Sequence, residues 1–296
     1  MELGYIGLGN MGGALARRLI AKHKLRVYDI RPEVMARFAD LGAQPTQNPK
    51  ALAAECDLVM TCLPTSKEVR DAVFGTDGLA AGLKQGAIIA DMTTGDPGET
   101  RAMAAELEKT GISLIDAPVS GGPHGADAGT IAIMVGASPA LFERCRPVFE
   151  AISPNIFHTG DVGTGHVMKL VNNIVAAGVR ALTFEAVTMG VKSGLSLKTC
   201  AEVLHKGSAR SYTTEITLPR LLDGNIAANF TLELMLKDVG LATKLGRDSG
   251  SPMLIANLVR ELFLTALNEN GAEEDVNTMI RLFERQAGAV VVPGER

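Results

Sequence analysis

The sequence is poor in aromatic residues and has no excess of positive charge. It contains no tryptophan, and Phe, Tyr and Trp together make up 4% of its 296 residues. Lysine and arginine total 29 against 33 acidic residues, which gives a formal charge of −4 at pH 7. Proteins that bind nucleic acids carry basic surfaces, and those that bind single strands add aromatic side chains for stacking. We therefore expect no nucleic-acid partner.

Cysteine is also scarce, and long apolar runs are missing. The four cysteines are widely spaced and form no C-x-x-C pair, and no H-E-x-x-H motif or carboxylate cluster indicates a metal site. Isolated thiols of this kind are typical of a reducing compartment. We find no secretion signal and no run of about 20 residues that is free of charge, glycine and proline. We expect a cytoplasmic protein that binds no metal and does not enter a membrane.

A glycine-rich segment follows the first apolar run. Residues 3–6 are strand-like, residues 14–20 have the spacing of an amphipathic helix, and G-x-G-x-x-G lies between them. In dinucleotide-binding proteins the first glycine permits a tight turn, the second lets the pyrophosphate approach, and the third lets the helix pack on the strand. The order strand, loop, helix therefore predicts a cofactor-binding loop. Its residues are Gly7, Leu8, Gly9, Asn10, Met11 and Gly12.

Asp29 ends a second strand-like run, residues 25–28, and lies 22 residues after Gly7. A carboxylate at this point accepts hydrogen bonds from the adenosine ribose of NAD and repels the 2′-phosphate of NADP. Arg31, two residues later, would partly offset that repulsion. We expect NAD as the cofactor, with NADP as the alternative. Taken alone, Asp29 would also fit as a turn residue before Pro32.

Strand-like and helical segments alternate through the first half of the chain. We expect strands at residues 57–62, 87–91, 113–116, 131–135 and 156–158, and helices at residues 49–55, 67–73, 98–110 and 139–151. This alternation indicates an α/β protein with a Rossmann-type, parallel, doubly wound sheet. Ligands bind beyond the carboxyl ends of such strands. Residues 63–65 and 92–94 are therefore candidates for the cofactor-facing rim, although ordinary turns would explain them equally well.

Residues 116–125 (DAPVSGGPHG) are too rich in glycine to predict a helix. Consecutive amides at Ser120, Gly121 and Gly122 are able to form a concave site for one carboxylate, because glycine leaves the N–H groups accessible. The Ser120 hydroxyl would add a donor. The alternative is a loop with unusual backbone angles and no ligand.

A single long helix is expected after Gly163 and Gly165. The chain then runs to about Gly194 without proline, and apolar residues recur every three or four positions. About 30 residues at 1.5 Å each span about 45 Å, enough to belong to two domains. Lys169, Asn172 and Asn173 lie on one face of its first turns. That face either is solvated or carries the chemistry of the protein.

Only helical periodicity recurs beyond this helix. We expect helices near residues 195–205, 217–222, 231–248, 254–268 and 276–286, and a tail from Ala289 onward with little to pack against. We divide the chain into a dinucleotide-binding domain, residues 1–162, and a helical substrate and oligomerisation domain, residues 163–296. The apolar helices of the second domain suggest a homodimer or homotetramer.

Four segments, in this order, resemble the β-hydroxyacid dehydrogenase family, whose best-known member is 3-hydroxyisobutyrate dehydrogenase. They are residues 4–12 (GYIGLGNMG), 116–122 (DAPVSGG), 163–173 (GTGHVMKLVNN) and 230–238 (FTLELMLKD). The resemblance extends over nearly the whole chain. It implies a Rossmann domain followed by an all-α domain, and an oxidoreductase that uses NAD(P) on a small 3-hydroxy acid or the corresponding semialdehyde.

The resemblance also implies roles for individual residues. Lys169 would be the catalytic residue, Asn173 would position the lysine and the substrate, and the turn Ser120, Gly121, Gly122 would hold the substrate carboxylate. Lys237 would act on the nicotinamide side of the site, although a Lys-Asp pair on a helix is usually a surface ion pair. Further cofactor contacts would come from Leu63, Pro64 and Thr94.

The family's reaction moves a hydride between a hydroxyl carbon and the nicotinamide ring. As the hydride leaves, negative charge builds on the oxygen, which an ammonium stabilises and a neutral amine relieves by accepting the proton. A lysine pKa is ordinarily about 10.4, so acting as a base near neutral pH requires that pKa to fall by about 3 units. We expect Lys169 to be the general acid/base; the weaker alternative is an electrostatic role only.

Three other functions remain open at this level. They are a reductase of small aldehydes such as glyoxylate, succinic semialdehyde or tartronate semialdehyde, an imine reductase, and a non-catalytic dinucleotide sensor. Imine reductases of this fold generally lack the site lysine. The segment 205–212, with Arg210, Ser211 and Tyr212, would meet a second polar group of the substrate or would be a plain surface loop. His124 is expected to shape the substrate site or to lie at the surface.

Overall fold

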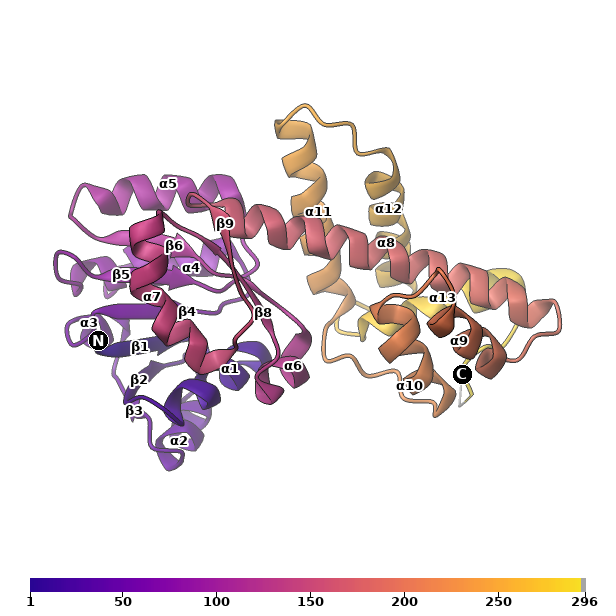
Figure 1. The fold of residues 1–296 in the computed structure, drawn as a ribbon, viewed down its shortest axis with the longest axis horizontal. Coiled ribbons are helices and arrows are strands. Elements are labelled where there is room, and N and C mark those ends of the chain that lie inside the picture. Colours follow the sequence, from indigo (N-terminus) through magenta and orange to yellow (C-terminus); the bar gives the residue numbers. More distant parts are fainter. Residues whose placement is uncertain (294–296) are drawn as a thin grey trace. The chain divides into compact units, whose positions relative to one another are not determined.

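The computed structural model describes residues 1–293 of the chain (Figure 1). Backbone contacts divide it into two compact units, the first covering residues 1–169 and the second beginning at Leu170. The long helix α8 (Thr164–Lys192) begins just after the boundary that the sequence suggested, between residues 162 and 163. The contacts divide this helix after its first six residues.

The first unit is built on one sheet, which within residues 1–293 contains nine strands. The order β3-β2-β1-β4-β5-β6 is parallel throughout and is the order of a Rossmann fold. β8 extends the sheet antiparallel to β6 and β7 and parallel to β9. The strands are β1 (Leu3–Ile6), β2 (Leu25–Tyr28), β3 (Gln44–Pro45), β4 (Leu58–Thr61), β5 (Ile88–Asp91), β6 (Ser113–Asp116), β7 (Val119–Ser120), β8 (Ala132–Gly136) and β9 (Ile156–Gly160).

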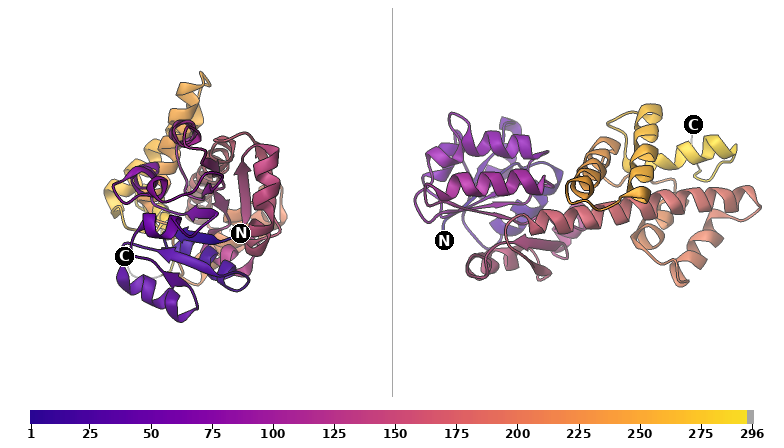
Figure 2. Two further views of the ribbon diagram at one scale, coloured as in Figure 1. Left: turned by 90° about the vertical axis from the view of Figure 1, so that its left-hand side faces the viewer. Right: turned by 90° about the horizontal axis from the view of Figure 1, so that it is seen from above.

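Helices cover both faces of this sheet, and each face has its own apolar core (Figure 2). Leu15 of α1 and Phe149 of α7 belong to one core, and Leu52 of α3 and Met103 of α5 belong to the other. Burial on both faces explains why the central strands read as continuous apolar runs. The helices are α1 (Asn10–Ile20), α2 (Pro32–Asp40), α3 (Pro49–Ala53), α4 (Ser66–Phe74), α5 (Pro97–Glu108), α6 (Gly122–Ala128) and α7 (Pro139–Ile152), with a 3₁₀ turn at Leu79–Ala81. The Rossmann-type α/β fold is confirmed.

The expectation of a loop without helix at residues 116–125 is wrong. Gly121 has φ 138° and Gly122 has φ 69°, so the two glycines turn the chain sharply after β7. Helix α6 then begins at Gly122, with Pro123 in its first turn, where a missing N–H costs nothing. The buried side chain of Ala126 packs in the core that α1 also covers. The glycines therefore set the entry to a helix and do not prevent one.

The second unit is helical, as expected. Within residues 170–293 the only strand-like pairing is a single bridge between Thr231 and Asp275. Its core includes Phe184, Leu218 and Phe263. After α8 the helices are α9 (Leu197–Lys206), α10 (Leu218–Leu222), α11 (Leu232–Asp248), α12 (Leu254–Asn270) and α13 (Ile280–Ala287), with a π-helical turn at Thr213–Thr217 and a 3₁₀ turn at Val276–Met279.

The tail does not hang free where the structure describes it. Val291 and Val292 are 5% and 0% exposed, and both donate backbone hydrogen bonds to the buried Glu284 carboxylate, at 2.6 and 2.9 Å. The expectation of an unpacked tail is therefore wrong for Val291 and Val292, whereas Val290 is 50% exposed. Residues 294–296 lie outside the described residues.

Helix α8 is also unusually apolar. Within residues 1–293 it is the one helix whose length and composition would allow it to cross a membrane, a test that core helices of water-soluble proteins also pass. No membrane-crossing segment was expected from the sequence. Only 39% of its most apolar window is buried, and Leu182 and Met189 are each 65% exposed. The helix thus combines a packed face with an exposed apolar one.

Candidate functional site

The glycine-rich loop between β1 and α1 shows why three glycines are spaced as they are. Gly7 has φ 92°, and a methyl group on it would lie 2.2 Å from the carbonyl oxygen of Cys62. A methyl group on Gly12 would lie 2.0 Å from the carbonyl oxygen of Gly7. Around Gly9, by contrast, the nearest atom is Nη2 of Arg31 at 3.8 Å. The protein's own packing requires the first and third glycines, whereas the second has open space beside it, as expected where a pyrophosphate approaches the backbone.

Helix α1 starts directly at this space. Gly9 is its N-cap residue and makes no side-chain cap, and Asn10 and Met11 form the first turn. Unpaired N–H groups at a helix start attract anions. Leu8, just before, donates its N–H to Oδ2 of Asp29 at 2.8 Å, which ties the loop to the end of β2.

Asp29 is 5% exposed, and both of its carboxylate oxygens accept hydrogen bonds. In addition to the Leu8 N–H, the Arg31 side chain forms a bidentate ion pair with Asp29, with Nε 2.9 Å from Oδ1 and Nη2 3.0 Å from Oδ2. Burial opposes the charge on Asp29, but the hydrogen bonds from Arg31 and from the backbone outweigh it, so the pKa of this carboxyl is lowered. Arg31 therefore neutralises the carboxylate that was expected to reject NADP, and its own side chain remains 49% exposed.

Two rim loops meet beyond β4 and β5. Leu63 donates its N–H to Oγ1 of Thr93 at 3.0 Å, and Thr93 donates its own N–H to Oδ1 of Asp91 at 3.0 Å. Pro64 and Thr94 follow directly on these two loops. The expected rim residues therefore stand side by side at the carboxyl edge of the sheet, where dinucleotides bind in such folds.

The start of α8 is fixed to the sheet by one buried carboxylate. Oδ1 of Asp116 accepts the Gly163 N–H at 2.6 Å, and Oδ2 accepts the His166 N–H at 2.7 Å. Gly165 allows this contact, because a methyl group there would lie 2.4 Å from the carbonyl oxygen of Met134 in β8. Burial raises the pKa of Asp116, although His166 and three backbone hydrogen bonds oppose the shift. Helix α8 is therefore held rigidly one turn before Lys169.

Lys169 and Asn173 lie one turn apart on α8 and are 9% and 7% exposed. Asn173 donates from Nδ2 to Oδ2 of Asp238 at 2.6 Å and accepts at Oδ1 from the Asn172 side chain at 2.9 Å. Nζ of Lys237 lies 3.1 Å from Oδ1 of Asp238. The solvated-face alternative for Lys169 and Asn173 is thus not what the structure shows.

Asp238 belongs to the site although no sequence pattern pointed to it. Its side chain is 2% exposed and that of Lys237 is 21% exposed, so the Lys-Asp pair is not an ordinary surface ion pair. The available signal was its position as the last residue of the segment 230–238. A carboxylate that holds the amide of Asn173 fixes which way that amide points.

Further residues that the sequence singled out lie on other elements of the two units. Ser120 pairs with Ala132 in the ladder between β7 and β8, and His124 is exposed on α6. Nε of Arg210 lies 2.6 Å from Oε1 of Glu215, and Tyr212 is 58% exposed. Arg210 therefore carries a paired charge before the π-helical turn.

Two family descriptions match consecutive parts of the chain. Residues 2–160 match the NAD binding domain of 6-phosphogluconate dehydrogenase, and residues 163–283 match the NAD-binding domain of NADP-dependent 3-hydroxyisobutyrate dehydrogenase. The first match covers the Rossmann sheet, and the second begins just before α8.

Individual relatives agree over full length. The chain is 36% identical to 2-(hydroxymethyl)glutarate dehydrogenase of Eubacterium barkeri, covering 100% of this chain and 99% of that protein. It is 32% identical to NAD-dependent L-serine dehydrogenase of Pseudomonas aeruginosa, covering 97% and 99%. Among solved structures, Mycobacterium tuberculosis 3-hydroxyisobutyrate dehydrogenase with L-serine matches with a TM-score of 0.86 at 29% identity, covering 95% and 99%.

Proposed function

The chain belongs to the β-hydroxyacid dehydrogenase family and is an NAD(P)-dependent oxidoreductase acting on a CH–OH group, and we propose that Lys169 is its general acid/base. One observation carries this proposal. Lys169 and Asn173 are both more than nine-tenths buried, one turn apart on a helix whose start is fixed by Asp116, and Asn173 is held by Asp238. Burying such polar groups is costly unless they are used or paired.

The roles of the side chains follow from the charges that the reaction creates. When bound, the nicotinamide cofactor accepts the hydride from the carbinol carbon. Lys169 takes the hydroxyl proton onto Nζ as the carbon–oxygen double bond forms, and in the reverse direction it returns that proton to the oxygen. Asn173 keeps the amine and the substrate oxygen aligned. Atoms and charge balance: two electrons and one proton leave as hydride, and one proton goes to the lysine.

Cofactor binding is assigned to the loop and rim residues described above. Gly9 leaves room for the pyrophosphate, α1 begins there, and Asp29 with Arg31 lies at the end of β2, where the adenosine ribose binds in Rossmann folds. Leu63, Pro64 and Thr94 form the nicotinamide side of the rim. We propose NAD as the preferred cofactor, and Arg31 makes NADP acceptable.

The substrate is proposed to be a small 3-hydroxy acid or its semialdehyde. Ser120, Gly121 and Gly122 would hold its carboxylate with N–H groups and a hydroxyl, and Lys237 would contribute a positive charge. A panel of mono- and dicarboxylic 3-hydroxy acids and small aldehydes, each with NAD and NADP, tests this by nicotinamide absorbance. Binding of NADH without turnover on the whole panel would favour a dinucleotide sensor, and turnover of imines alone would favour an imine reductase.

The acid/base role has its own test. We expect Lys169→Ala to lower kcat by about 10²- to 10⁴-fold, the usual contribution of a positioned acid/base. Lys169→Arg keeps the charge but removes the titratable base, so it should also be impaired and should lose the pH dependence that a base produces. Lys198→Ala, at a side chain that is 74% exposed, is the control. An arginine variant with normal kcat and an unchanged pH profile would refute the assignment.

A homodimer or homotetramer in the cytoplasm completes the proposal. Leu254, Ile255 and Leu258 of α12 are 83%, 78% and 62% exposed, which is unusual for adjacent apolar residues on a monomer. A second copy covering this face would remove them from water. Light scattering of the wild type and of Leu258→Glu tests this: the variant should have a lower mass than the wild type, and a monomeric wild type would contradict the proposal.

A further inference from the structure

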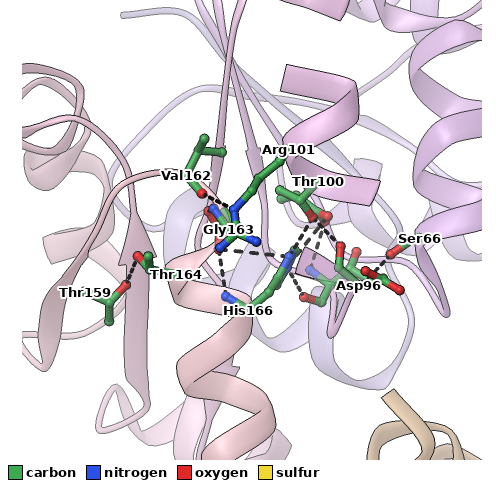
Figure 3. Close-up of polar contacts among 12 residues, drawn as sticks. Ser66, Asp96, Thr100, Arg101, Thr159, Val162, Gly163, Thr164 and His166 are labelled. Atoms are coloured by element: carbon green, nitrogen blue, oxygen red, sulfur yellow. Dashed lines mark hydrogen bonds and ion pairs between the residues drawn. The ribbon is translucent and has the colours of Figure 1, made fainter. Parts of the chain in front are cut away.

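His166 occupies a position that the reaction itself does not explain. Its side chain is 0% exposed, although it lies only three residues before Lys169 on α8. Both ring nitrogens have partners: Nδ1 is 2.8 Å from Oγ1 of Thr100, and Nε2 is 2.9 Å from the carbonyl oxygen of Thr93. Figure 3 shows the ring between the start of α8 and the residues around Thr100. A carbonyl oxygen only accepts, so Nε2 carries a proton.

The second partner connects the ring to the cofactor rim. Thr93 is held on three sides: its N–H donates to Asp91, its hydroxyl accepts from Leu63, and its carbonyl accepts from His166. Two of these contacts come from the sheet and the neighbouring rim loop. Only His166 reaches Thr93 from the helix that carries Lys169.

The remaining neighbours of the ring belong to the same loop and to α5. A methyl group on Gly95 would lie 3.0 Å from Cε1 of His166, so the loop packs directly on the ring. Asp96 accepts at its carbonyl from the Thr100 hydroxyl and donates its N–H to Ser66, which fixes the other end of the loop (Figure 3). The ring thus fills the space between the loop 92–96 and the first turn of α8.

Two buried carboxylates flank this ring. Oδ2 of Asp91 lies 3.8 Å from Nε2, and Oδ2 of Asp116 lies 4.0 Å from Nδ1. Asp116 also accepts the backbone N–H of His166 at 2.7 Å. The backbone of His166 is therefore anchored to β6 through Asp116, and its side chain is anchored to the loop after β5 through Thr93. An element anchored at two points in this way has little freedom to shift or rotate.

We propose that His166 is a positioning residue that locks the loop after β5 to the start of α8 and so sets Lys169 relative to the cofactor rim at Thr93 and Thr94. The inference rests on the proposed acid/base role of Lys169. A displacement of about 1 Å at a reacting group lowers the rate by up to about 100-fold. Loss of the His166 contacts is therefore expected to slow the hydride-transfer step.

Two variants of His166 test the proposal. His166→Phe keeps a planar ring but loses both hydrogen bonds, and it should lower kcat at least about tenfold with less than about threefold change in the KM of the hydroxy acid. His166→Gln keeps an N–H donor for the Thr93 carbonyl, the hydrogen bond that joins α8 to the rim loop, so it should recover most of that loss. With substrate deuterated at the carbinol carbon, the isotope effect on kcat should rise in His166→Phe, because hydride transfer becomes more fully rate-limiting.

Controls separate positioning from folding. Thr159→Val removes a 3.1 Å hydrogen bond to the Val135 carbonyl and a 2.9 Å hydrogen bond to Thr164, which is also at the start of α8 but on the side away from the rim loop (Figure 3). It should leave kcat and the isotope effect unchanged. His166→Phe could lower the melting temperature but keep the wild-type isotope effect and the wild-type kcat, calculated per mole of enzyme that binds NADH. That result would show that the positioning role is wrong. Loss of the acid/base role would show differently, as a normal rate in the Lys169 variants.

Discussion

Nδ2 of Asn173 lies 2.6 Å from Oδ2 of Asp238, and both side chains are more than nine-tenths buried. Because an amide has distinct donor and acceptor ends, this one hydrogen bond determines that the Asn173 oxygen points the other way, toward the Asn172 side chain. The carboxylate thus fixes the orientation of a residue that the proposed mechanism places beside the lysine.

Replacing that carboxylate should impair catalysis more than stability. In Asp238→Asn the new amide can still face Asn173, but the charge that holds both Asn173 and Lys237 is lost. We expect kcat to fall by about ten- to 100-fold, as for misplacement of a catalytic group by about 1 Å. Asp248→Asn, at the exposed end of the same helix, is the matched control. Equal activity of both variants would contradict the role of Asp238.

The three glycines of the loop should respond differently to alanine. Gly12→Ala forces a methyl group against the Gly7 carbonyl, so it should destabilise the protein by about 1–3 kcal/mol, the range for overpacking. Gly9→Ala meets no atom closer than 3.8 Å and should leave the melting temperature unchanged while raising the Kd of NAD at least about tenfold. Thermal unfolding and cofactor titration of the pair separate packing from binding. Unchanged cofactor affinity in Gly9→Ala would exclude the proposed pyrophosphate site.

Arg31 should determine how well NADP is accepted. Its guanidinium lies across Asp29 and is half exposed, so it is able to meet a 2′-phosphate as well. We expect Arg31→Ala to raise the KM of NADP about tenfold, the equivalent of about 1.4 kcal/mol, with a smaller effect on NAD. Steady-state kinetics with both cofactors measure this, with Arg37→Ala, on the helix α2 that Arg31 precedes, as the control. A change of equal size for NAD and NADP would argue against selectivity at Arg31.

Asp29 should stabilise the fold in a pH-dependent way. Its pKa is lower in the folded protein than in the unfolded chain, so its ionised form favours folding; that contribution is complete above the unfolded value and is lost as the pH falls through the folded value. Asp29→Asn should therefore be less stable than the wild type by about 1–2 kcal/mol at neutral pH, with the difference closing below about pH 4. Urea unfolding at both pH values measures it, and a difference that does not change with pH would contradict the mechanism.

Local patterns in the sequence were sufficient for much of this architecture. The spacing of apolar residues located most strands and helices, and the order strand, G-x-G-x-x-G, helix located the cofactor loop, because these signals depend on neighbours within about ten residues. The same signals failed at residues 116–125, where glycine content pointed to a loop. There Gly121 and Gly122 supply the backbone angles of a turn that leads into α6.

Only the tertiary structure decided which polar residues are buried and which partners they have. From the sequence, Asp238 looks like half of a surface ion pair, and only the structure shows its hydrogen bond to Asn173. Likewise, only the structure shows that the His166 ring contacts Thr93 and Thr100, which are more than sixty positions away in the chain. The sequence by itself determined the order of the elements and the residue types available to them. Burial and hydrogen-bond pairing depend on segments that are distant in the chain, and so no local pattern specifies them.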